Sequence, residues 1–152
     1  YCGQNLGSGK ISRIKEGIRS VIIITWVWSA IMMISSYTIA PWLVHMVTGT
    51  NDSEIVQTAT LYLKINTVFY FVPAMITVLR NSMQGIGDHT TPIISSMIEL
   101  VGKVLIVIIL VPHLDYMGII LAEPIVWILM VIPLIIKIKK NPVLKEKEIT
   151  YN

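Results

Sequence analysis

A long stretch without any charged side chain constrains this sequence more than any other feature. Residues 20–51 contain no Asp, Glu, Lys or Arg. A helix needs about 20 apolar residues to cross the hydrocarbon of a bilayer. The composition agrees, because 54% of the 152 residues are hydrophobic and only 14% are charged, whereas soluble domains carry roughly a quarter charged residues. The sequence therefore predicts an all-α membrane protein.

The hydrophobic runs predict four transmembrane helices. We expect them at about residues 20–44, 53–81, 92–111 and 116–136. Asp52 or Ser53 is placed to cap the second helix, and Pro112 to end the third. Before them, residues 1–19 are predicted to form a cytoplasmic loop and an interfacial helix, and residues 137–152 a cytoplasmic tail.

A short polar segment, residues 79–92, joins the second predicted helix to the third. Its Gly85 and Gly87 tolerate backbone angles that other residues resist, and Pro92 suits the first turn of a new helix. We expect Asp88 and His89 to cap that helix. The segment is therefore predicted to be a hinge between two helical hairpins.

The basic residues predict the orientation in the membrane. All Lys and Arg residues except Lys64 and Lys103 lie before residue 20, at the hinge or after residue 136. Cytoplasmic segments carry an excess of Lys and Arg. We therefore expect a multi-pass protein of the cytoplasmic membrane with both termini and the hinge on the cytoplasmic side, and with lipid as a partner.

Several other functions do not fit the sequence. The net charge of +3 comes from basic residues at the edges of hydrophobic runs, without interleaved aromatic residues, so we expect no nucleic acid partner. The segment from Gly3 to Lys10 fails the phosphate-loop pattern, because Gln4 stands where Gly is needed and Ile11 where a hydroxyl is needed. No Cys or His group has zinc spacing, and no catalytic arrangement is present in the spans. We predict neither an enzyme nor a cofactor.

Four ionisable residues inside the predicted helices are the best functional candidates: Glu99, Lys103, Glu123 and Lys64. Such residues usually face a bundle interior or a watery cavity. Ser95, Glu99, Gly102 and Lys103 share one helical face. Glu99 and Lys103 are spaced for an ion pair, which either links helices or serves a proton or cation. Glu123 is likewise open to ion coupling, gating or simple packing, and Lys64 to a functional role or to snorkelling.

Gating candidates follow from prolines, from the hinge and from its one basic residue. Pro73 interrupts the second predicted helix and is expected to kink it. Pro124 follows Glu123 directly and removes a helix hydrogen bond next to that carboxylate. Arg80, Gly85 and Gly87 complete the set.

Four segments together resemble the multidrug and toxic compound extrusion (MATE) family. They are GQNLGSG at residues 3–9, LRNSMQGIGD at 79–88 with Pro92, IELVGK at 98–103 and EPIVW at 123–127. The resemblance extends to about residue 137. It includes a Gln-Asn-x-Gly turn, carried here by Gln4, Asn5 and Gly7, that follows the second helix of each lobe in the family.

That resemblance implies a secondary antiporter with about twelve helices in two lobes. This chain would be the last four helices of the C-terminal lobe, and the missing N-terminal lobe would be its partner. Implied substrates are lipophilic, often cationic drugs and toxic compounds, exchanged for protons or sodium. The acidic residue that sodium-coupled members carry near the position of Pro73 is absent here, so the coupling ion stays open.

Two alternatives to an antiporter remain. One is a non-transporting membrane fragment or assembly partner. The other is a flippase for lipid-linked sugars from the same superfamily, which would favour a cavity rich in Arg and Lys because such substrates carry pyrophosphate.

Overall fold

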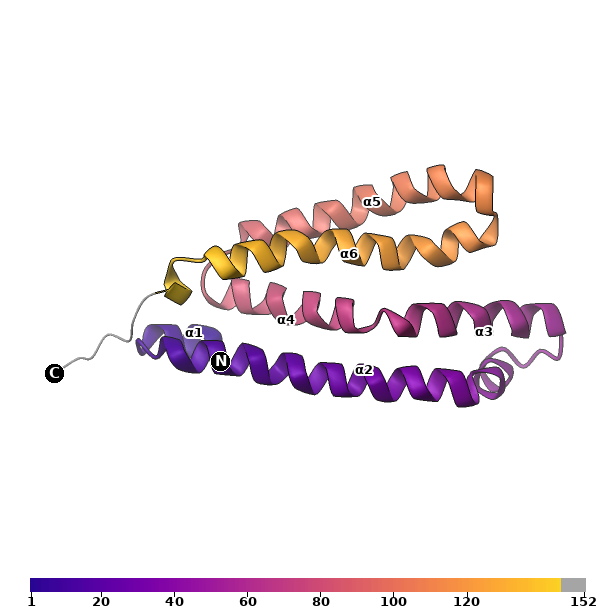
Figure 1. The fold of residues 1–152 in the computed structure, drawn as a ribbon, viewed down its shortest axis with the longest axis horizontal. Helices are drawn as coiled ribbons and strands as arrows, with labels where there is room; N and C mark the ends of the chain where they lie inside the picture. Colours follow the sequence, from indigo (N-terminus) through magenta and orange to yellow (C-terminus); the bar gives the residue numbers. More distant parts are fainter. Residues whose placement is uncertain (146–152) are drawn as a thin grey trace.

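The chain folds into long helices that lie side by side (Figure 1). The computed structural model describes residues 1–145, and every regular element in this range is helical. The elements are α1 (Cys2–Gly7), α2 (Ile11–Thr48), α3 (Ser53–Val68), α4 (Phe71–Gly85), α5 (Thr90–Leu114), α6 (Tyr116–Lys140) and the 3₁₀ helix η1 (Val143–Lys145). Helices α5 and α6 form one antiparallel hairpin, while α2 runs antiparallel to α3 and α4.

Three helices are long and apolar enough to cross a membrane: α2, α5 and α6. Helices α3 and α4 meet this criterion together, but they are bent by 54° at their junction. The described chain therefore has 3 candidate spans, or up to 4 if the bent pair is one span. The all-helical membrane fold predicted from the sequence is confirmed.

Three helices are longer than the sequence indicated. Helix α6 continues to Lys140, into the predicted tail, of which residues 146–152 lie outside the described residues. Helix α2 continues without a break from Ile11, because Ile11 and Ile14 are buried against Met83 and Ile86 and so tie its first turns to the bundle. The predicted interfacial segment and first span are thus parts of one helix. Helix α5 extends past Pro112 to Leu114, because a proline in the last turn removes only one backbone hydrogen bond.

The second predicted helix is divided into α3 and α4. Asp52 caps α3 as expected, since its Oδ1 accepts the Glu54 N–H at 2.9 Å. The interruption lies at Phe69 and Tyr70, just before Pro73. A proline has no N–H for the carbonyl four residues earlier, and the Phe69 carbonyl instead accepts the Val72 N–H at 2.8 Å. This tighter turn accounts for the bend ahead of the proline.

Two side chains of α2 form hydrogen bonds to the backbone at this interruption. Trp26 Nε1 donates to the Phe71 carbonyl at 3.1 Å, and Ser29 Oγ donates to the Tyr70 carbonyl at 3.3 Å. The Trp26 ring also packs edge-on against Phe71, with centroids 6.2 Å apart. Two side chains of α2 are therefore hydrogen-bonded to the backbone where α4 begins.

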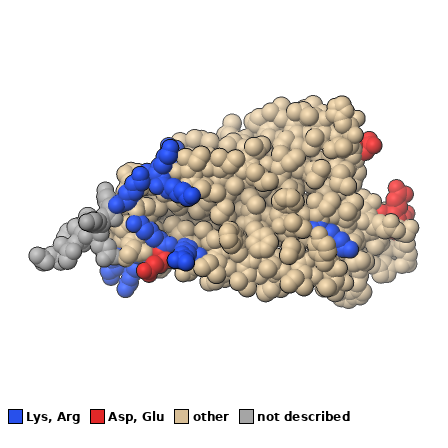
Figure 2. Space-filling view, in the orientation of Figure 1, with Lys and Arg blue, Asp and Glu red and all other residues tan. Residues whose placement is uncertain are grey.

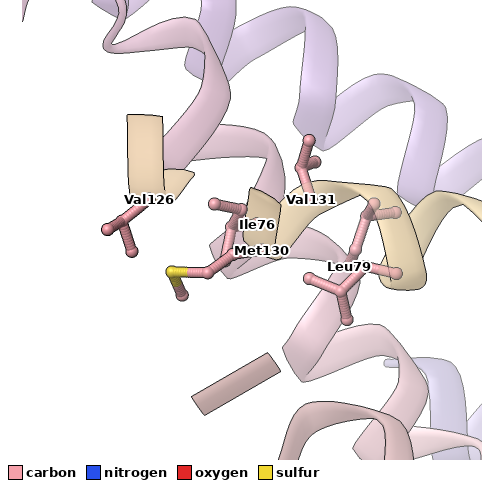
Figure 3. Close-up of a cluster of buried hydrophobic side chains, with 6 residues drawn as sticks. Ile76, Leu79, Val126, Met130 and Val131 are labelled. Carbon is pink, nitrogen blue, oxygen red and sulfur yellow. The ribbon is translucent and has the colours of Figure 1, made fainter. Parts of the chain in front are cut away.

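The main core lies between α4 and α6 (Figure 3). Its buried side chains are Ile76, Leu79, Val126, Met130, Val131 and Leu134. Helix α6 is the central element. In its most apolar 18-residue segment, 39% is buried inside the structure, against 6% in the corresponding segments of α2 and α5. Much of the apolar surface of α2 and α5 is left exposed, as expected of helices that face lipid or other membrane spans.

Candidate functional site

Four charged side chains from three helices form one chain of ion pairs, which we call the charge ladder: Arg80, Glu99, Lys103 and Glu123. Lys103 Nζ lies 3.2 Å from Glu99 Oε1 and 3.2 Å from Glu123 Oε1. Arg80 Nη1 lies 3.7 Å from Glu99 Oε2. The ladder joins α4 to α5 and α5 to α6, and its formal charges cancel.

Local sequence explains how the ladder is aligned. Glu99 and Lys103 are four residues apart on α5, so their side chains lie on the same face. Ser96 lies one turn before Glu99 and accepts a hydrogen bond from Arg80 Nη2. Ser95, which the sequence placed on the same face, instead donates to the Met130 carbonyl at 3.4 Å and fixes α5 on α6.

The ladder is only partly covered by the four helices. Its side chains are between 28% and 38% exposed. A charge that faces lipid at mid-bilayer costs at least about 2.5–3.5 kcal/mol on insertion scales. Ion pairing among these side chains lowers this cost.

Pro124 follows the last carboxylate of the ladder within an unbroken helix. Helix α6 runs through it, and Pro124 is buried. Because proline has no N–H, the carbonyl of Ile120 lacks its helical partner. The proline therefore leaves a backbone acceptor one turn from Glu123 in the same helix.

The hinge glycines differ in their roles. Gly87 has φ of +89°, a conformation that favours glycine. Gly85 is the last residue of α4 and has helical geometry. A side chain there would crowd α1, because a Cβ would lie 3.0 Å from the Cβ of Cys2. One glycine shapes the turn, and the other lets α1 approach α4.

Asp88 fixes the beginning of α5 after the hinge. Its carboxylate accepts the Thr91 N–H at 3.0 Å and the Thr91 hydroxyl at 2.8 Å. The backbone hydrogen bond from Thr91 is the main reason that the pKa of Asp88 lies below its ordinary value. His89 makes no side-chain capping bond, so only the Asp88 half of the capping expectation is confirmed.

The Gln-Asn-x-Gly turn is organised by its asparagine. Asn5 is buried, its Nδ2 donates to the Tyr1 carbonyl at 2.9 Å, and its own carbonyl accepts the Lys10 N–H at 2.9 Å. Gln4 and Gly7 are exposed. The motif therefore stabilises the turn between α1 and α2, rather than forming a cradle for a ligand.

Lys64 lies apart from the ladder. Its Nζ lies 5.8 Å from the centroid of the Tyr37 ring on α2, within the range of a cation–π contact. The described residues offer it no carboxylate within ion-pair distance. On the same helix, Thr60 Oγ1 and Asn66 Oδ1 are buried without a hydrogen-bond partner in the described structure.

The sequence pointed to the charged residues of the ladder but not to the ion pairs that join its helices. Helix spacing predicted the Glu99–Lys103 pair, whereas the contacts of Arg80 with Glu99 and of Lys103 with Glu123 depend on how helices pack. Ser96 was missed, although a serine three residues before an intramembrane glutamate is a readable signal. Trp26 and Ser29 had no such signal, because nothing in the sequence locates the carbonyls that they bond.

The comparisons with known proteins identify a family. The MatE family profile matches residues 1–111. No curated protein and no solved structure matches the chain. The matched region includes the Gln-Asn-x-Gly turn, the hinge, Glu99 and Lys103, and it covers most of the sequence. With its apolar helices, this chain is a multi-pass membrane protein that belongs to the MatE family of transporters.

Proposed function

We propose that this chain forms the last four membrane spans, in the C-terminal lobe, of a secondary antiporter. The antiporter exports lipophilic or cationic drugs and toxic compounds in exchange for protons or sodium. The charge ladder carries the proposal, because partly exposed carboxylates among apolar helices can hold a proton or a cation.

The geometry of Lys103 suggests how ion binding is linked to movement. Its ammonium group is shared by Glu99 on the same helix and Glu123 on α6. A proton or cation on Glu123 weakens the attraction across the α5–α6 interface and leaves Lys103 to Glu99. Arg80 extends the effect to α4, which leads directly into the hinge. Ion exchange at the ladder would thereby alter the packing of three helices.

The distribution of charge supports an orientation with both termini in the cytoplasm. Figure 2 shows most of the visible Lys and Arg side chains gathered at one end of the molecule, with acidic atoms among them, and the other visible Asp and Glu side chains at the opposite end, near a further basic side chain. In Figure 1, the first end is that of α1, η1 and the hinge after α4. This is the asymmetry that the positive-inside bias produces.

Efflux measurements test the proposal. Glu99→Gln and Glu123→Gln, each in the full-length protein, should abolish gradient-driven export of a cationic dye without reducing the amount of protein in the membrane. Glu54→Gln is a matched control, since Glu54 lies in the exposed first turn of α3. Undiminished efflux from both ladder variants would refute the coupling role.

The alternatives lead to other results. A non-transporting fragment would leave dye retention unchanged with or without an ion gradient. A lipid-linked sugar flippase would need cationic groups for pyrophosphate. Arg80 and Lys103 are already neutralised by two carboxylates, so the ladder supports the antiporter better.

A further inference from the structure

A second polar site lies between α2 and α3, away from the charge ladder. It is a groove of about 570 Å³ lined by Pro41 of α2 and by Val56, Gln57, Thr58, Thr60, Leu61 and Lys64 of α3. Pockets of roughly 300–1,000 Å³ suit small organic ligands. Gln57, Thr60 and Lys64 follow the spacing of one helical face, so their polar groups line the same side of the groove.

Lys64 brings a positive charge without a carboxylate. Lys103 has two acidic partners at 3.2 Å, whereas Lys64 has only the Tyr37 ring at 5.8 Å within the described chain. At about 1.5 Å per residue, Lys64 lies roughly 16 Å along α3 from Ser53, and the Tyr37 ring of α2 lies beside its ammonium group.

Thr60 supplies an independent sign of a ligand. Its side chain lines the groove, the residue is only 8% exposed, and its hydroxyl has no hydrogen-bond partner. A buried polar group without a partner is costly and calls for an explanation. This oxygen is closed to solvent in the ligand-free groove, so a ligand that displaces the side chains over it would satisfy this hydroxyl and the Lys64 ammonium together.

We propose that this groove binds an amphiphilic organic anion, with its carboxylate or phosphate at Lys64 and Thr60 and its apolar part along Pro41, Val56 and Leu61. The positive charge of Lys64 favours an anionic group, and the apolar side chains of the groove favour a hydrophobic chain or ring. The inference is independent of the antiport mechanism, because the groove shares no residue with the ladder.

The binding experiment uses a fluorescent carboxylate, 11-(dansylamino)undecanoic acid, with the full chain in nonionic detergent micelles. Dansyl emission excited through the tryptophans reports only probe that is bound near the protein, and Trp42 lies next to Pro41. Lys64→Gln should weaken binding about tenfold or more, as expected for the loss of a charged hydrogen bond. Lys64→Arg should keep most of the affinity, and Thr60→Val should weaken binding several-fold.

Two controls separate this site from general attraction. Lys139→Gln removes the same charge from an exposed position at the end of α6 and should leave affinity unchanged. The methyl ester of the probe lacks the charge and should bind weakly and equally to all variants. Helical circular dichroism shows that each variant is folded. Equal carboxylate binding by the unaltered chain and Lys64→Gln, or no saturable binding at all, overturns the proposal.

A third arm distinguishes the source of the anion. Phosphatidylglycerol is added to the micelles, with phosphatidylcholine as the zwitterionic comparison. If phosphatidylglycerol displaces the probe from the unaltered chain, the site accepts a lipid headgroup. If neither lipid displaces it, the site selects a free carboxylate amphiphile. Both results support an anion site, and they differ only in its natural occupant.

Discussion

At the scale of single residues, Lys103 is the most connected charge in the protein. It is the only described side chain that contacts both intramembrane carboxylates. Lys103→Met would leave Glu123 unpaired and Glu99 with Arg80 alone, while Glu123→Gln removes one charge and leaves Lys103 paired. Because the groups are about a third exposed, we expect Lys103→Met to lower the free energy of unfolding by about 1–2 kcal/mol.

Thermal unfolding in detergent measures this difference. Glu123→Gln should cost less than Lys103→Met, and Lys139→Met, which alters an exposed lysine, should change nothing. A Lys103→Met protein as stable as the Glu123→Gln protein would show that the ladder does not act as a connected set.

Asp88 predicts a pH dependence at the hinge. Its pKa is lowered in the folded chain, chiefly by the Thr91 N–H, so the ionised form stabilises the start of α5. This stabilisation is fully present above the ordinary value of 3.8 and is lost as the pH falls through the lowered value. Asp88→Ala should speed amide exchange at Thr91 at neutral pH, and the difference should shrink in strong acid. An exchange difference independent of pH would contradict this assignment.

At the scale of helices, the break between α3 and α4 is held by side chains of α2. Trp26→Phe removes the indole donor to the Phe71 carbonyl but keeps an aromatic ring. We expect a loss of about 1 kcal/mol in stability and a more variable bend. Spin labels at Leu61 and Thr77 should then give a broader distance distribution. Trp28→Phe is the matched control, since Trp28 is 60% exposed.

The α5–α6 hairpin depends on the absence of a side chain at Gly118. A Cβ there would lie 2.8 Å from the Leu110 carbonyl carbon, which is backbone and cannot move aside cheaply. Gly118→Val should therefore lower the free energy of unfolding by about 2 kcal/mol or more. Gly7→Ala is the control, because nothing lies within 4 Å of the added Cβ. The close approach is unimportant if both variants unfold at the same temperature.

These helices also show what the sequence could and could not predict. Hydrophobic runs and missing charges are local properties, so they predicted the helices well. Pro73 predicted a kink, but the turn ahead of it depends on which carbonyl loses its partner and on Trp26 of another helix. In the same way, residue spacing predicted the Glu99–Lys103 pair, whereas Arg80 reaches Glu99 only after α4 and α5 have packed.

At the scale of the whole molecule, the separation of charge predicts which end meets the cytoplasm. The basic residues of α2 and α6 lie at the hinge end, and the acidic residues before α3 and α6 lie at the other. Moving the basic end across a membrane would oppose the positive-inside bias. With Cys2 replaced by Ser, a membrane-impermeant maleimide added to intact cells should label Asn51→Cys and spare His89→Cys. Both positions are exposed in the folded chain, so burial cannot explain a difference. After the cells are opened, His89→Cys should react as well. The reverse pattern in intact cells would place the hinge outside and overturn this orientation.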